Sequence, residues 1–224
     1  MLLTAPALGV LYVLAARYQE GPGTPAHRQG RAMAFLPPGL AALVCRASES
    51  QAACLQGYFG TRIPKEIKGL PERYCRGLSG MPGRVCSEAV AVRLLDFPSS
   101  VRLCERLPDP GACARRMGLG AYVLGGRMRV EEECSKAEGS LRLNCHLGAA
   151  VEMVKRRPGE NLKPAWELCT QADADGSLCA QGLGSVLLGM VQDAGRARQL
   201  CLVLPSPQAA RCAAGVEEAA RERR

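Results

Sequence analysis

The residues with the most distinctive chemistry in this 224-residue chain are twelve cysteines, which recur as six pairs. The spacing within a pair is C-x8-C, C-x9-C or C-x10-C. An even number of regularly paired cysteines is typical of disulfides formed in an oxidising compartment. The pairs are Cys45/Cys54, Cys75/Cys86, Cys104/Cys113, Cys134/Cys145, Cys169/Cys179 and Cys201/Cys212.

Other cysteine chemistry fits this spacing less well. Zinc sites use ligand pairs of the C-x2–4-C type, which the chain lacks, and His27 and His146 are its only histidines. Haem attachment needs C-x-x-C-H, which is also absent. Cys145 and His146 could be imagined as a nucleophile and its base, but adjacent residues of a helix point about 100° apart. We therefore expect no metal, no cofactor and no catalytic residue.

The remaining polar motifs have structural interpretations. The turn at residues 173–177 (Asp-Ala-Asp-Gly-Ser) suggests a calcium loop, but Gly182 stands where an EF-hand needs a carboxylate. The Gly-Leu-Gly sequences at 118–120 and 182–184 lie inside expected helices, unlike dinucleotide-binding loops. The signatures of serine acyl-enzymes are missing. We expect Trp166 to pack in the core or between units, and the acidic run at 131–133 to face solvent.

Helical patterns follow the second cysteine of each pair. Cys179, Leu183, Val186, Leu187 and Met190 share one face at 3.6 residues per turn. The residue three positions after the second cysteine is small in five of six copies, which allows a neighbouring helix to approach closely. Each unit is therefore predicted to consist of a short helix that ends in cysteine, a turn, and a longer helix that starts in cysteine. Similar stripes are Cys86, Val90, Leu94, Phe97, then Cys113, Met117, Ala121, Leu124, and around Cys145 Leu143, Leu147, Ala150, Val151, Val154.

The first cysteines of the pairs recur about every 30 residues, a period typical of stacked supersecondary units. The composition is 47% hydrophobic but only 4% aromatic, and alternating strand patterns are absent. These observations predict an all-α fold, an α-solenoid of about six short helical hairpins, each with a C-x8-10-C pair flanking its turn. The expected units lie near residues 40–60, 68–97, 98–126, 128–157, 161–193 and 195–224 of a repeat domain spanning 40–224.

The pairing of the cysteines has two candidate schemes. Local pairing across each turn is favoured, because the end of one helix and the start of the next are neighbours by construction. Closing a loop of about ten residues contributes about 2–3 kcal/mol in the chain-entropy model. The rival scheme joins one hairpin to the next, as in Cys54 to Cys75, since both cysteines lie on the same edge of an antiparallel array.

The N-terminal region differs from the repeats. Residues 1–18 contain an apolar run, which is expected to form a helix serving as a signal peptide or, if uncleaved, a membrane anchor. Residues 19–39 are rich in proline and glycine and predict a linker, after which Pro38 suits the first turn of a helix. Either role of the first segment, together with the disulfides, predicts an extracytoplasmic location, periplasmic or secreted. The net charge of +8 is spread through the units and indicates solvated helix faces rather than a nucleic-acid site.

The sequence Leu-Gly-Ala-Tyr-Val-Leu-Gly-Gly at 119–126, after Cys113, resembles the Leu-Gly…Tyr…Gly signature of tetratricopeptide-like repeats. In particular it is similar to their secreted, cysteine-rich variety, in which a disulfide staples each helical hairpin. Residues 54–60 and 179–184 match this signature more weakly. The resemblance concerns the architecture of residues 40–224, and it implies an α-solenoid used for binding proteins or envelope polymers.

These observations favour a non-enzymatic, extracytoplasmic scaffold that presents an extended helical surface to a protein partner. One alternative is an accessory structural subunit of a membrane-protein complex, held by residues 1–18. A second is an envelope hydrolase or its regulator, which would need a pocket with paired carboxylates or a histidine beside a hydroxyl. No nucleic-acid partner is expected.

Overall fold

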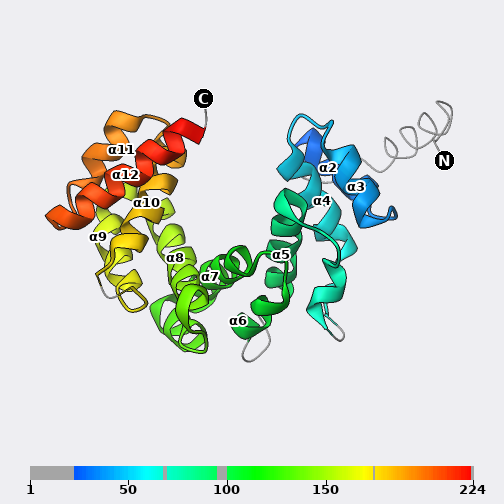
Figure 1. Ribbon diagram of the computed structural model, residues 1–224, viewed down its shortest axis with the longest axis horizontal. Helices are drawn as coiled ribbons and strands as arrows, with labels where there is room; N and C mark the ends of the chain where they lie inside the picture. The colour runs from blue at the N-terminus through cyan, green and yellow to red at the C-terminus, as the bar shows by residue number, and fades with distance from the viewer. Residues whose placement is uncertain (1–22, 68–69, 95–99, 174, 223–224) are drawn as a thin grey trace. The chain divides into compact units, whose positions relative to one another are not determined.

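The computed structural model describes residues 23–67, 70–94, 100–173 and 175–222, which form helices and turns without any strand. The predicted all-α fold, built of helical hairpins, is thus confirmed. The predicted apolar helix within residues 1–18 lies outside the described residues. The helices are α2 (Pro25–Ala32), α3 (Pro38–Cys45), α4 (Gln51–Arg62), η1 (Pro71–Tyr74), α5 (Gly80–Leu94), α6 (Ser100–Leu103), η2 (Cys104–Arg106), α7 (Pro110–Cys134), α8 (Gly139–Arg156), α9 (Pro158–Cys169), α10 (Ser177–Val191), α11 (Ala194–Cys201) and α12 (Ser206–Glu222) (Figure 1).

The cysteines form disulfides across the hairpin turns. Five local pairs have Cα–Cα distances of 5.5–5.9 Å: Cys45–Cys54, Cys75–Cys86, Cys134–Cys145, Cys169–Cys179 and Cys201–Cys212. Cys104 and Cys113 are also disulfide-bonded, so every cysteine of the described chain is oxidised. These linkages follow the local scheme and exclude the rival linkage of Cys54 to Cys75.

The long helices begin before their cysteines, although the sequence pattern predicted that they start at them. In the C-x10-C hairpins the helix begins six positions before the second cysteine, at Gly80, Gly139 and Ser206. In the C-x8-C hairpins it begins three positions before, at Gln51 and Pro110. Positions three apart lie on the same helix face, so both spacings turn the cysteine toward the preceding short helix. This periodicity relates the two commoner spacings; in the C-x9-C hairpin the helix begins two positions before Cys179, at Ser177.

The contacts divide the chain into two compact units. Unit 1 comprises Met1–Leu94 and Arg106–Cys113, and unit 2 comprises Leu95–Glu105 and Ala114–Arg224. Unit 1 contains α2 to α5, and unit 2 contains α8 to α12 with most of α7.

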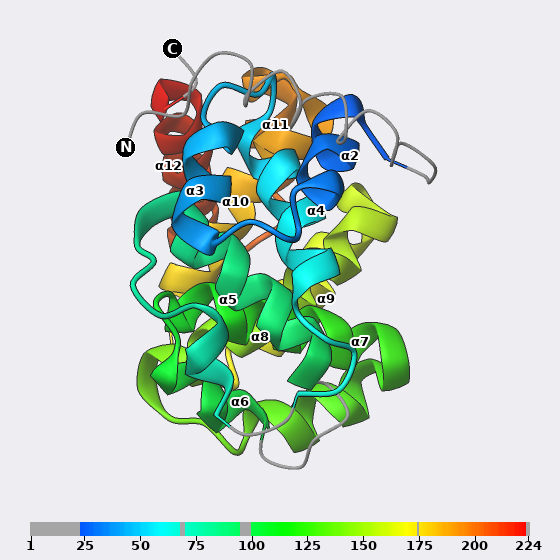
Figure 2. The same cartoon turned by 90° about the vertical axis from the view of Figure 1, so that its right-hand side faces the viewer.

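The segment predicted to be a linker contains a packed helix of unit 1. Within residues 19–39, Pro25–Ala32 forms α2, which buries Ala26, Gly30 and Ala32. Thr24 caps this helix with its hydroxyl oxygen, and Pro25 occupies the first turn. The predicted start of the next helix at Pro38 is confirmed by α3. Helices α2, α3 and α4 lie side by side (Figures 1 and 2).

Reciprocal glycine contacts bring three pairs of helices into backbone contact. A Cβ atom added at Gly57 of α4 would lie 2.0 Å from the carbonyl oxygen of His27, and one at Gly30 of α2 would lie 1.7 Å from that of Cys54. No larger side chain fits there, because a real Cβ never approaches a carbonyl so closely. The same exchange joins α7 to α8 through Gly118 and Gly148, and α10 to α12 through Gly184 and Gly215.

In all three crossings each helix contributes a backbone carbonyl and, three residues later, a glycine. One helix of each crossing uses the carbonyl of a second cysteine, namely Cys54, Cys145 or Cys212. The disulfide therefore holds the same turn of helix that makes the close crossing. Helix α2 has no cysteine, but it packs against α4 in the same way that α7 packs against α8 and α10 packs against α12. It is therefore a helix of the repeat array and not a linker.

The hairpin turns of unit 2 are joined to their neighbours by side-chain hydrogen bonds. Arg102 Nε donates to the carbonyl of Lys136 at 2.6 Å. Gln208 Nε2 donates to the carbonyl of Asp175 at 2.7 Å. A third such bond, from Gln171 Nε2 to the Glu131 carboxylate, is 3.1 Å long. Each bond thus ties a hairpin turn of this unit to a helix of the neighbouring hairpin.

The apolar stripes form the cores largely as predicted. Val90 and Leu94 of α5 are buried, as are Leu183 and Leu187 of α10. The predicted stripe of α7 is wrong at its end, because Leu124 is 65% exposed. The helix breaks immediately after this residue, at Gly125 and Gly126, and Gly126 has a φ of +64° that favours glycine. Phe97, the last residue of the α5 stripe, lies outside the described residues.

Candidate functional site

The structure places the twelve predicted cysteines in the interior, each with a relative exposure of 0%. A thiolate attacking a disulfide must reach a sulfur atom along an open path. Buried disulfides are therefore closed to exchange while the fold is intact, and these cysteines hold the hairpins. Cys145 is bonded to Cys134 and offers no thiol to His146.

His146 is a buried polar residue of α8, with 2% exposure. Burial, reinforced by the nearby Arg142 cation, lowers its pKa from 6.5 to about 4. A hydrogen bond with the Leu168 backbone and the charge of Glu131 raise the pKa and only partly offset this effect. Nδ1 of the ring has no hydrogen-bond partner among the described residues. The imidazole is thus neutral at pH 7 and packs against α9 as a core residue.

This burial predicts acid sensitivity. Between about pH 6.5 and pH 4.5 the unfolded chain binds a proton at His146 and the folded chain does not, so the free energy of unfolding should fall by about 2 kcal/mol as pH is lowered. Denaturant unfolding of the wild type and of His146→Gln at several pH values measures this contribution. The variant should lose less stability than the wild type over the window, and equal losses would contradict the buried neutral ring.

The acidic turn at 173–177 caps a helix. Asp173 Oδ2 accepts hydrogen bonds from the backbone N–H groups of Leu178 and Cys179 at 2.8 and 3.2 Å, at the start of α10. Asp175 Oδ1 accepts from Ser177 N–H at 2.8 Å, and this bond lowers the pKa of Asp175. Both carboxylates thus serve the first turn of a helix, where a negative charge is stabilising.

The same turn borders an open depression of about 520 Å³. It is lined by Asp173, Asp175, Ser177, Leu178, Gln181 and Arg211. Within the described part of the chain no three His, Cys, Asp or Glu residues gather as a metal site would need.

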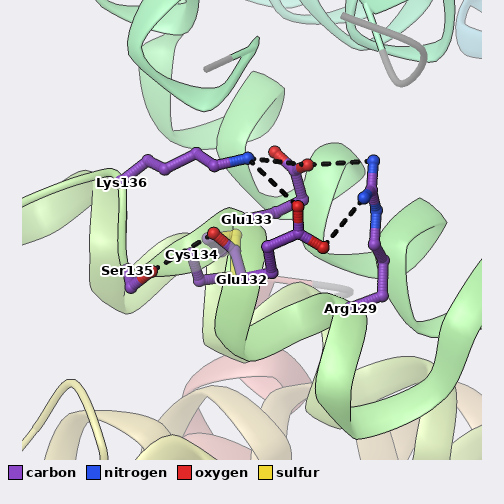
Figure 3. A network of polar contacts seen from close by, with 7 residues as sticks. Arg129, Glu132, Glu133, Cys134, Ser135 and Lys136 are labelled. Atoms are coloured by element: carbon purple, nitrogen blue, oxygen red, sulfur yellow. Dashed lines mark hydrogen bonds and ion pairs between the residues drawn. A yellow bond between two sulfur atoms is a disulfide. The ribbon is translucent and has the colours of Figure 1, made fainter. Parts of the chain in front are cut away.

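Glu133 corrects the prediction that the acidic run at 131–133 faces solvent. Its side chain is 2% exposed, and its carboxylate lies 3.0 Å from Arg129 Nη2 and 3.0 Å from Lys136 Nζ (Figure 3). Glu133 precedes Cys134 and occupies the position that is apolar in the other five repeats. Of the other five residues at this position only Leu168 is fully buried, so burial here is specific to these two hairpins, and two cations compensate the buried charge of Glu133. Glu131 and Glu132 are exposed.

Trp166 was expected in the core or between units, but it is half-buried and packs against the turn of its own hairpin, before α10. Its Nε1 donates a hydrogen bond to the carbonyl of Gly176 at 3.1 Å. A Cβ atom at Gly176 would lie 2.3 Å from that nitrogen, so the indole and the turn fit closely. This bond ties α9 to the turn that its disulfide also closes.

Exposed apolar side chains flank the break in α7. Val123, Leu124 and Met128 are 52%, 65% and 81% exposed around the break in α7. The guanidinium of Arg156 lies 5.3 Å from the ring centre of Tyr122, the residue before Val123. We call Val123, Leu124 and Met128 the α7 surface. It was not predicted, because the apolar stripe that ends at Leu124 indicated that this residue is buried.

A second apolar surface lies on unit 1. Helix α3 buries Ala41 and Ala42 but leaves Leu40 and Leu43 47% and 61% exposed. Phe35, just before this helix, is 59% exposed. The sequence feature that could have predicted this exposed apolar surface is the composition of α3, Pro-Gly-Leu-Ala-Ala-Leu-Val-Cys. This helix is apolar on every side, although one side faces solvent.

No protein-family model matches this chain, and neither the curated proteins nor the solved structures contain a significant match. Across the described residues, no helix combines the length and apolar character required to cross a bilayer. Function must therefore be inferred from the geometry and chemistry of the chain itself.

Proposed function

We propose that this protein is an extracytoplasmic, non-enzymatic helical-repeat scaffold that binds a protein partner. Its disulfides suggest an oxidising environment outside the cytoplasm, periplasmic or secreted. The resemblance to disulfide-stapled tetratricopeptide-like repeats supports the same assignment, because such arrays present helical surfaces to partners.

The proposal rests chiefly on the α7 surface. Aliphatic side chains exposed together cost solubility, and on a protein surface such patches mark interaction sites. Disulfides and glycine crossings fix the helices of unit 2 that flank it, so little conformational entropy is lost when a partner binds. A rigid, partly apolar surface is suited to recognition.

Polar substitution of the α7 surface tests the proposal. Leu124→Gln/Met128→Gln should weaken partner binding about tenfold or more, as loss of central apolar contacts does in other interfaces. Leu202→Gln is the matched control, because Leu202 is 75% exposed and lies in the turn between α11 and α12. Tagged protein, crosslinked in its native cells and analysed by mass spectrometry, should retain its partner in the control and lose it in the double variant.

Two outcomes would overturn parts of this proposal. Equal recovery of the partner with both variants would exclude the α7 surface as the binding site. Stoichiometric co-purification with a membrane complex would instead support an accessory subunit held by residues 1–18, since a scaffold is expected to associate only transiently.

A further inference from the structure

The positive charge of the chain is concentrated in residues 23–94, which include α3, although it was predicted to be spread through the units. Residues 23–94 contain ten Lys or Arg and four Asp or Glu, a net charge of +6 out of the total of +8. Three of these cations are Arg31, Arg46 and Arg62. None of the three forms an ion pair within the described residues.

These three arginines lie close to the exposed apolar residues, either along the chain or in space. Arg46 follows the last residue of α3 and is exposed, three positions after Leu43. Arg62 Nη1 donates to the carbonyl of Ala34 at 2.8 Å, which places its guanidinium beside Phe35. Arg31 precedes Phe35 by four positions at the end of α2. Arg31 and Arg46 thus lie near the exposed Phe35 and Leu43 along the chain, and Arg62 lies near Phe35 in space. We call Phe35, Leu40 and Leu43 the α3 face.

We propose that the α3 face docks on an anionic membrane surface. Its apolar side chains enter the interface between headgroups and acyl chains, and the nearby arginines contact lipid phosphates. This goes beyond the proposed protein scaffold and does not depend on it, since the two proposals use different residues of different units.

Charge distribution favours a bilayer over an acidic protein segment. A peptide carboxylate neutralises one or two cations at a fixed point. The excess of unit 1 is spread from α2 to α5, and an extended anionic surface attracts all of it at once. The exposed groups on α3 itself are aliphatic and offer no side-chain hydrogen bond for specific pairing with a peptide.

A tryptophan on the face reports its contact with lipid. Phe35→Trp is introduced into the full chain, and the wild type, whose only tryptophan is Trp166, supplies the background spectrum. The protein is mixed with vesicles of phosphatidylglycerol and phosphatidylcholine, or of phosphatidylcholine alone, each with and without brominated acyl chains. The emission of the introduced tryptophan reports contact of the α3 face itself with lipid, whether or not residues 1–18 also enter the bilayer. Leu43→Trp provides an independent reporter if the first variant fails to fold.

The proposal predicts that the emission of the introduced tryptophan shifts to shorter wavelength and is quenched by bromine only on the anionic vesicles. Adding Arg31→Gln/Arg46→Gln should lower the ratio of docked to undocked protein about 30-fold, which corresponds to about 2 kcal/mol for two surface cations. Lys163→Gln, at an exposed position of unit 2, is the control and should leave the ratio nearly unchanged.

Three results would overturn the proposal. Emission that is unchanged on both kinds of vesicle would show that the face does not meet lipid. An equal shift on both would exclude the role of the arginines. A shift that depends on protein concentration without lipid would show that a second copy of the chain, or another protein in the sample, covers the face.

Discussion

Gly57→Ala should destabilise the protein by about 3 kcal/mol or more. The added Cβ would lie 2.0 Å from the carbonyl oxygen of His27, and neither atom can rotate away, because both are attached directly to the backbone. Helices α2 and α4 must therefore separate, which also disturbs the core around Tyr58 and Phe59. Denaturant unfolding under non-reducing conditions measures the loss.

Gly60→Ala is the matched control for this substitution. Gly60 lies in the same helix, but nothing would approach its Cβ within 4 Å. Alanine is the better helix former, so this variant should be more stable than the wild type by up to about 1 kcal/mol. Similar unfolding free energies for the two alanine variants would contradict the close crossing of α2 and α4.

Removal of the last disulfide, as Cys201→Ala/Cys212→Ala, should cost about 3 kcal/mol. The linkage closes a loop of about ten residues in the unfolded chain, and both cysteines are fully buried in the folded one. Thermal and denaturant unfolding, followed by circular dichroism, compare the variant with the wild type.

The wild type should resist mild reductants that act on exposed disulfides, because the sulfur atoms become accessible only when a hairpin opens. Rapid reduction of the folded protein, or a double variant as stable as the wild type, would show that the disulfides do not hold the array.

The repeat could be predicted because cysteine and glycine recur together at fixed spacing. The cysteine period indicated the number of hairpins, and the small residue three positions after the second cysteine indicated close helix packing. The structure confirms that role at Gly57, Gly148 and Gly215. The sequence alone did not identify which helix each of these glycines packs against. The glycines on the opposite helices, Gly30, Gly118 and Gly184, lie about one repeat away in the chain.

The differences between expectation and structure have local physical causes. Helix α2 was not predicted, because the prolines and glycines around it indicated a linker. In the structure Pro25 begins this helix and Gly30 allows it to pack closely on α4. Glu133 was assigned to solvent by its charge, but it is buried beside Arg129 and Lys136, whose cations compensate its carboxylate. The two exposed apolar surfaces were not predicted, because periodicity identifies a hydrophobic face and does not say whether another helix covers it.

Peptide mapping of the native protein under non-reducing conditions decides whether each hairpin is closed by its own disulfide. Protease digestion after blocking of free thiols, followed by mass spectrometry, should recover linked peptides that join each first cysteine to the second cysteine of the same hairpin, with no blocked thiol. Linkages between successive hairpins, such as Cys54 to Cys75, or a full set of twelve blocked thiols, would contradict the disulfide-held array and the extracytoplasmic assignment that depends on it.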